Sequence, residues 1–160
     1  MGNVFQNLTI INTGLSDLMI EIFHYSDFDL GGTAGNDSAV LVGNPDGIQI
    51  DVSDPTETAP MIGYGADAYE VNRYSRLLRD LTDGNVDDMD NSGLPFTNRD
   101  FTGGFQWSAT IGVGQRGEFL TQFGSNAPLL DPSVTAIPEP GVGLLVGLGL
   151  MRLARRPRSA

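Results

Sequence analysis

The sequence predicts a mainly β protein, an antiparallel β-sandwich with one amphipathic side helix and a C-terminal tail. Short segments rich in β-branched and aromatic residues alternate with turns containing Gly, Pro, Asn or Asp. Residues 105–113 alternate strictly between apolar and polar side chains, which is typical of a strand with one buried face. The chain has 160 residues, 40% of them hydrophobic, enough for the core of one domain, which we expect to span residues 1–124.

The first half of this domain is expected to consist of strands. Val4–Thr13 is rich in β-forming residues and ends in a turn signal. Leu18–Tyr25 has apolar side chains on both faces, which predicts a central strand covered on both sides and joined to the first in a hairpin or meander. Three shorter strands are expected at Ser38–Val42, Gly47–Val52 and Pro60–Tyr64.

One helix is expected beside the sheets, over residues 68–82. Apolar residues recur there at helical spacing, namely Val71, Tyr74, Leu78 and Leu81. Residues 83–93 are acidic and rich in glycine, which predicts an irregular loop.

The domain is expected to end in a hairpin formed by Phe105–Val113 and Glu118–Phe123. Trp107 belongs to the inward-facing set of the first of these strands. We therefore expect it in the core, in preference to a sugar-stacking platform with Tyr25, Tyr64 and Tyr69.

The charge balance bears on partners and on chemistry. All nine cationic side chains are Arg, and residues 1–137 carry 19 Asp and Glu against 5 Arg. Such an acidic domain repels a phosphate backbone, so we expect no nucleic-acid partner. The chain has one His, no Lys and no Cys, which removes thiolate sites and most general bases. We therefore do not expect an enzyme.

The C-terminal residues differ in character from the domain. Residues 125–137 are Pro-rich and without periodicity, which indicates a linker. An apolar run of 11 residues, Gly141–Met151, follows, and an arginine-rich end closes the chain. This order is typical of a stop-transfer segment, with the arginines cytoplasmic and the acidic domain outside, although a spanning helix needs roughly 20 residues.

The tail, residues 138–160, resembles the PEP-CTERM sorting signal of bacterial surface proteins. The matching residues are Pro138, Glu139, Pro140, Arg152, Arg155, Arg156 and Arg158. The resemblance implies export, transient anchoring in the inner membrane as a transmembrane segment, and processing by an exosortase-type membrane enzyme. Such proteins carry a leader, and since the first 14 residues show none, we expect the true start upstream of Met1. Residues 24–32 and 100–107 resemble, more loosely, β-rich surface domains that precede such tails.

Acidic residues in the turns indicate sites for Ca²⁺. The best candidate is in the loop, with Asp83, Asp87, Asp88, Asp90, Asn91 and Ser92 as ligands. Asp88-x-Asp90-x-Ser92-Gly93 repeats the alternating oxygen ligands and the turn glycine of a calcium loop, but Arg99 stands where the closing acid belongs. The alternative is a solvated acidic turn. A second, weaker cluster consists of Asp27, Asp29 and Asp37, followed by Asp51 and Asp54.

These observations together favour an exported, surface-associated structural or adhesive protein, located at the cell surface or outside the cell. The alternative is an extracellular carbohydrate-binding module or polysaccharide hydrolase that uses acidic loop residues. A catalytic pair of His24 and Asp27, with Ser26 or Ser38 as nucleophile, is disfavoured because no Ser lies in a nucleophile-elbow motif. We expect His24 to pack beside Tyr25 at a strand end, with its ring bonded to backbone or to a carboxylate.

Overall fold

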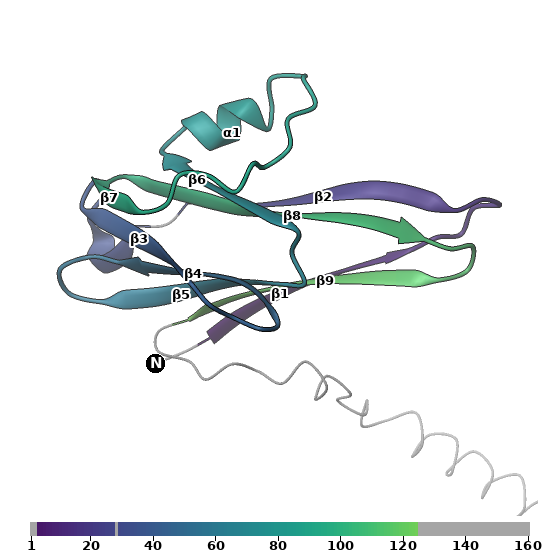
Figure 1. Ribbon diagram of the computed structural model, residues 1–160, viewed down its shortest axis with the longest axis horizontal. Helices are drawn as coiled ribbons and strands as arrows, with labels where there is room; N and C mark the ends of the chain where they lie inside the picture. Colours follow the sequence, from purple (N-terminus) through teal and green to yellow (C-terminus); the bar gives the residue numbers. More distant parts are fainter. Residues whose placement is uncertain (1–2, 28, 125–160) are drawn as a thin grey trace, which may run out of the picture. The chain divides into compact units, whose positions relative to one another are not determined.

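The computed structural model describes residues 3–27 and 29–124 of the chain. Two antiparallel β-sheets pack against each other across a shared hydrophobic core (Figure 1). The expected mainly β, sandwich-like class is therefore confirmed. The expected linker, residues 125–137, and the expected tail, residues 138–160, lie outside the described residues.

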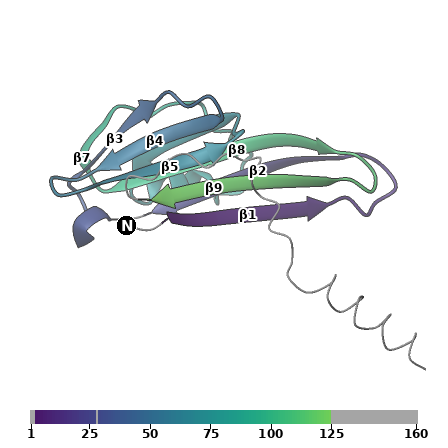
Figure 2. The ribbon, with the colours of Figure 1, turned by 90° about the horizontal axis from the view of Figure 1, so that it is seen from below.

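The larger sheet has six strands in the order β1-β9-β5-β4-β3-β7 (Figure 2). These strands are β1 (Asn3–Ile11), β9 (Arg116–Gly124), β5 (Thr58–Tyr64), β4 (Gly47–Ser53), β3 (Asp37–Val42) and β7 (Phe96–Arg99). The three short strands predicted in the first half are confirmed, each one or two residues longer than expected. They form a continuous antiparallel meander.

The smaller sheet has three strands, β2 (Leu18–Asp27), β8 (Phe101–Ile111) and β6 (Ala68–Arg73), with β8 in the middle. The prediction that Leu18–Tyr25 is a central strand covered on both sides is wrong. β2 pairs with β8 alone and forms an edge of the sheet, and Met19 on its outer face is 81% exposed. Apolar residues on both faces of a strand do not distinguish a central strand from an edge strand.

Both predicted hairpins are wrong, because consecutive strands belong to different sheets. β1 pairs with β9 and β2 pairs with β8, so the connections β1–β2 and β8–β9 each carry the chain from one sheet to the other. The buried side chain of Asn12 joins these two connections. Its Nδ2 donates to the carbonyls of Ser16 (2.8 Å) and Ile111 (2.7 Å), and its Oδ1 accepts from the N–H of Gly14 (2.9 Å).

The core lies between the sheets and is rich in aromatic side chains. Phe101 and Phe105 of β8 are fully buried, and the ring of Trp107 packs edge-on against Phe105 and Phe119. The Trp107 Nε1–H donates to the carbonyl of Tyr64 at 2.8 Å, which satisfies its polar group inside the core. The prediction that Trp107 is a core residue is confirmed.

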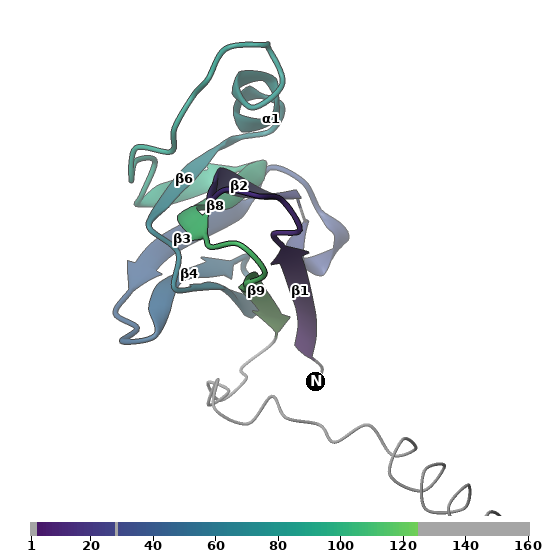
Figure 3. The same ribbon diagram turned by 90° about the vertical axis from the view of Figure 1, so that its right-hand side faces the viewer.

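The helix predicted over residues 68–82 is wrong for its first half, because residues 68–73 form strand β6. Only Arg76–Asp80 form a helix, α1, which lies beside β6 on the side away from the larger sheet (Figure 3). Tyr69 and Val71 of β6, two residues apart, both belong to the core cluster, which matches the period of a strand and not that of a helix. Ser75, in the left-handed region at φ +65°, separates the strand from the helix.

Candidate functional site

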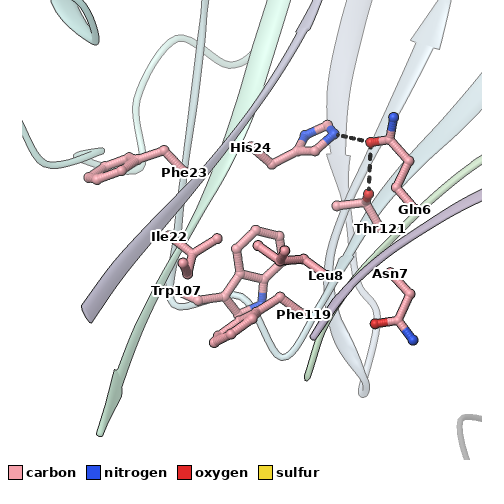
Figure 4. A pocket seen from close by; sticks show the side chains of 9 residues that line it. All are labelled: Gln6, Asn7, Leu8, Ile22, Phe23, His24, Trp107, Phe119 and Thr121. Carbon is pink, nitrogen blue, oxygen red and sulfur yellow. Dashed lines mark hydrogen bonds between the residues drawn. The ribbon is translucent and has the colours of Figure 1, made fainter. Parts of the chain in front are cut away.

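A pocket of about 150 Å³ opens between β1 and β2, the edge strands of the two sheets (Figure 4). Its walls are mostly apolar, with Trp107 and Phe119 facing Leu8 and Ile22. Polar side chains gather at one end. The lining residues are Gln6, Asn7, Leu8, Ile22, Phe23, His24, Trp107, Phe119 and Thr121. The pocket is lined by strand residues on every side, so its shape is set by the two sheets.

His24 lies at the polar end of this pocket. Its Nε2 is 2.8 Å from Oε1 of Gln6, and because that oxygen only accepts, we assign the ring proton to Nε2. The ring packs against Phe105 and Phe123, and Nδ1 is buried without a partner. Burial lowers the pKa of His24, because a second proton on Nδ1 finds no acceptor. The partner is thus an amide oxygen, and the expected backbone or carboxylate partner is wrong.

The residues considered for catalysis and for sugar stacking do not come together. Alternation along β2 directs His24 and Asp27 to opposite faces of the strand. The oxygen of Ser38 accepts a hydrogen bond from the N–H of Asn98 at 3.2 Å. Trp107, Tyr64 and Tyr69 are at most 9% exposed, and the Tyr64 hydroxyl donates to Oε1 of Gln122 at 2.6 Å. These groups serve the packing of the sandwich.

The acidic loop, residues 83–93, is irregular as predicted, and hydrogen bonds attach it to the smaller sheet. Gln106 of β8 is central to this attachment, since its Nε2 donates to Oδ1 of Asp88 (2.8 Å) and its Oε1 accepts from the N–H of Met89 (2.7 Å). Asn91 exchanges two hydrogen bonds with the backbone of Tyr69, and Ser92 accepts from the N–H of Val71. The loop therefore runs along β6 as a partner of that strand.

The expected calcium ligands of this loop have separate local roles. Asp83 accepts from the backbone and side-chain N–H groups of Asn85, whereas Asp88 faces Gln106. Within residues 3–27 and 29–124, no three His, Cys, Asp or Glu side chains lie close enough together to hold a metal ion. Calcium binding by Asp83, Asp87, Asp88, Asp90 and Ser92 stays a prediction.

A carboxylate that the sequence analysis missed, Glu21 of β2, also reaches Gln106. Its Oε2 accepts from Gln106 Nε2 at 3.1 Å and from the Ser108 hydroxyl at 2.7 Å. One amide group thus links Glu21 to Asp88. The strict alternation of residues 105–113 placed Gln106 on the outer face, but that face is covered by the loop, so Gln106 is only 5% exposed.

The second acidic cluster has an unusual member in Asp37, at the start of β3, which is fully buried. Burial raises the pKa of Asp37, and the nearby carboxylates Asp29 and Asp54 raise it further, while backbone hydrogen bonds from Phe101 and Leu30 act in the opposite direction. Burial, with the negative charges of Asp100 and Asp29, also raises the pKa of Asp27. Asp51 lies apart from this cluster and accepts from the Gln49 side chain at 2.8 Å.

The residues expected to form the sorting signal, namely Pro138, Glu139, Pro140, Arg152, Arg155, Arg156 and Arg158, lie outside the described residues. Among the residues that are described, no helix has the length and apolar character needed to cross a membrane.

Comparison with known proteins gives no family assignment. No protein-family model matches the chain, and no curated protein sequence matches it. The geometry of the domain and the sequence of the tail are therefore the basis for a function.

Proposed function

We propose that the chain is an exported, surface-associated structural or adhesive protein whose last residues are a sorting signal. The observation that carries the proposal is the order of features in residues 138–160, where Pro138-Glu139-Pro140 precedes an apolar run and four arginines. This segment carries one Glu against 4 Arg, whereas residues 1–137 carry 19 Asp and Glu against 5 Arg. That contrast supports an acidic domain outside the membrane and a basic end inside.

The geometry of the domain supports a structural role. His24 is engaged with Gln6 and is separated from Asp27 by the alternation of β2. The acidic loop is attached through Gln106 to the smaller sheet, so its backbone is held in one arrangement. A sandwich with its loops fastened in this way is a stable scaffold for presenting a surface outside the cell.

Intact mass of the protein recovered from its own cells tests export and processing. We expect cleavage near Pro138–Pro140 to remove the arginine end in cells that contain an exosortase-type enzyme, and the full mass in cells that lack it. Pro138→Ala/Pro140→Ala should prevent this cleavage. The matched control is Pro128→Ala/Pro132→Ala, which changes two linker prolines and should leave cleavage unchanged. A surface-located product that still ends in Ala160 would contradict the proposal.

The alternative function, a polysaccharide hydrolase or carbohydrate-binding module, differs in what it predicts. A hydrolase requires turnover of a polysaccharide that disappears when one acidic residue is changed. We expect no turnover in a hydrolysis screen of extracellular polysaccharides, since His24 and Asp27, the catalytic pair considered, lie on opposite faces of β2.

A further inference from the structure

Three of the five arginines in residues 1–137 line a single hollow, which is unexpected in so acidic a domain. The hollow has a volume of about 440 Å³. Its lining residues are Arg73, Tyr74, Ser75, Arg76, Arg79 and Asp100. Its residues come from the end of β6 through to α1 and from the residue before β8, and none of them lines the pocket between β1 and β2. Figure 1 shows α1 beside β6.

Backbone hydrogen bonds hold the walls of this hollow in place. Arg73 ends β6, and Arg76 and Arg79 lie one turn apart on α1. The N–H of Tyr74 donates to the carbonyl of Asp100 at 3.0 Å, which joins the two sides of the hollow. The left-handed conformation of Ser75, whose carbonyl accepts from the N–H of Arg79 at 3.1 Å, turns the chain so that all three arginines line the same space.

Asp80 and Asp100 only partly neutralise the positive charge of the hollow, since three arginines line it. Asp80 lies 3.9 Å from Arg76 and 3.5 Å from Arg79, and all three side chains are substantially exposed, so these ion pairs are weak. Arg73 forms no ion pair with any residue in the described part of the chain. Its planar guanidinium is free to donate paired hydrogen bonds to an incoming carboxylate, and the weak contacts of Arg76 and Arg79 with Asp80 leave N–H groups of both for the same ligand.

We propose that this hollow binds the carboxylate of an acidic sugar unit in an extracellular polysaccharide. The volume lies within the range of small-molecule sites. Tyr74 is 53% exposed and offers a ring face for a sugar ring, while Asp100 can accept hydrogen bonds from sugar hydroxyls. Asp100 repels the carboxylate of an acidic peptide and of an acidic sugar alike, so the ring hydroxyls that the sugar offers to Asp100 are what favours a saccharide. The location of this ligand outside the cell rests on the proposed function.

The charge of the whole domain limits where such binding acts. An acidic domain repels a polyanion at long range, but at physiological salt the Debye length is about 8 Å. Direct contacts between the arginines and the ligand inside the hollow therefore determine the affinity. Replacing the arginines by side chains of the same charge but a different shape should therefore weaken binding.

Titration calorimetry of the full chain with an oligogalacturonate, at physiological ionic strength, tests the proposal. We expect saturable binding that falls by about tenfold or more in Arg73→Gln/Arg76→Gln, because charge-assisted hydrogen bonds are lost. Arg73→Lys/Arg76→Lys, which keeps the charge, should also weaken binding. Tyr74→Ala should weaken it as well. Arg116→Gln, which removes an exposed arginine outside the hollow, is the matched control and should bind as the parent does.

Two further ligands and two contrary outcomes make the test decisive. The methyl-esterified oligosaccharide should bind at least about tenfold more weakly, since it lacks the charge. Polyglutamate that binds as tightly as the oligogalacturonate would overturn the saccharide assignment. No binding by the parent, or equal binding by Arg73→Gln/Arg76→Gln with an unchanged melting temperature, would overturn the site. Because purified protein is used, these outcomes are independent of whether cells export and process the chain.

Discussion

At the level of single residues, Asn12 is a polar side chain with a large expected effect on the fold. Its side chain satisfies a carbonyl and an N–H of the β1–β2 connection and the carbonyl of Ile111 at the end of β8. Asn12→Ala leaves these groups without partners in a site that is 4% exposed, so we expect the free energy of unfolding to fall by about 3 kcal/mol. Urea unfolding measures this change. Asn7→Ala, at an exposed asparagine of β1, should change it by less than about 0.5 kcal/mol, and an equal effect would contradict this role.

His24 gives the domain a pH dependence of known sign. Its pKa is lowered in the folded state from 6.5, so the unfolded chain takes up a proton first as the pH falls. The contribution of His24 to stability is therefore complete above pH 6.5 and is lost as the pH falls from 6.5 to the lowered folded value. We expect His24→Gln to remove this loss, as measured by urea unfolding between pH 7.5 and pH 5.

Asp37 acts in the direction opposite to His24. Burial raises the pKa of Asp37, so its contribution to stability decreases as the pH rises from its unfolded value of 3.8 towards the raised folded value. This contribution is common to both proteins and cancels in the difference between the parent and His24→Gln. A difference that does not change with pH would show that His24 does not titrate as we expect.

At the level of elements, the sequence predicted most strands, but β6 was mistaken for part of a helix and β7 was not predicted. Val71 fits both a helical spacing with Tyr74 and a strand spacing with Tyr69, and only the pairing of residues 68–73 with β8 separates these two interpretations. Local periodicity cannot supply that information because the partner strand lies about 30 residues away in the chain. The same limit explains why the acidic loop was predicted but its attachment through Gln106 and Glu21 was not.

The acidic loop provides a prediction at this scale. If Asp88 and Asp90 bind Ca²⁺ with the weak affinity of extracellular modules, about 10⁻⁴–10⁻³ M, then 10 mM Ca²⁺ raises the melting temperature by mass action. We expect this rise to vanish in Asp88→Asn/Asp90→Asn. A control in NaCl at the same ionic strength separates the effect of calcium binding from the effect of charge screening. An unchanged melting curve would leave the hydrogen bond to Gln106 as the role of Asp88.

At the level of the whole molecule, the arrangement of the sheets depends on contacts that are distant in the sequence. β1 pairs with β9, which is near the other end of the domain's sequence, and β2 pairs with β8. These two edge strands are therefore each paired with a strand that is distant in the chain. Composition and turn residues predicted a sandwich, but they contain no signal for which strand joins which sheet. The hollow at Arg73 was missed for a related reason, since its arginines were expected on one continuous helix over residues 68–82.

The net charge of the molecule leads to the last prediction. Residues 1–137 carry 19 Asp and Glu against 5 Arg, and their mutual repulsion is greater in the compact state than in the unfolded chain. Salt screens this repulsion, so we expect the unfolding free energy at pH 7.5 to rise by roughly 1 kcal/mol, or about 4 °C in melting temperature, between 0.05 and 0.5 M NaCl. At pH 4, where the carboxylates are partly protonated, the rise should shrink. A rise of equal size at both pH values would instead assign the effect of salt to burial of apolar surface.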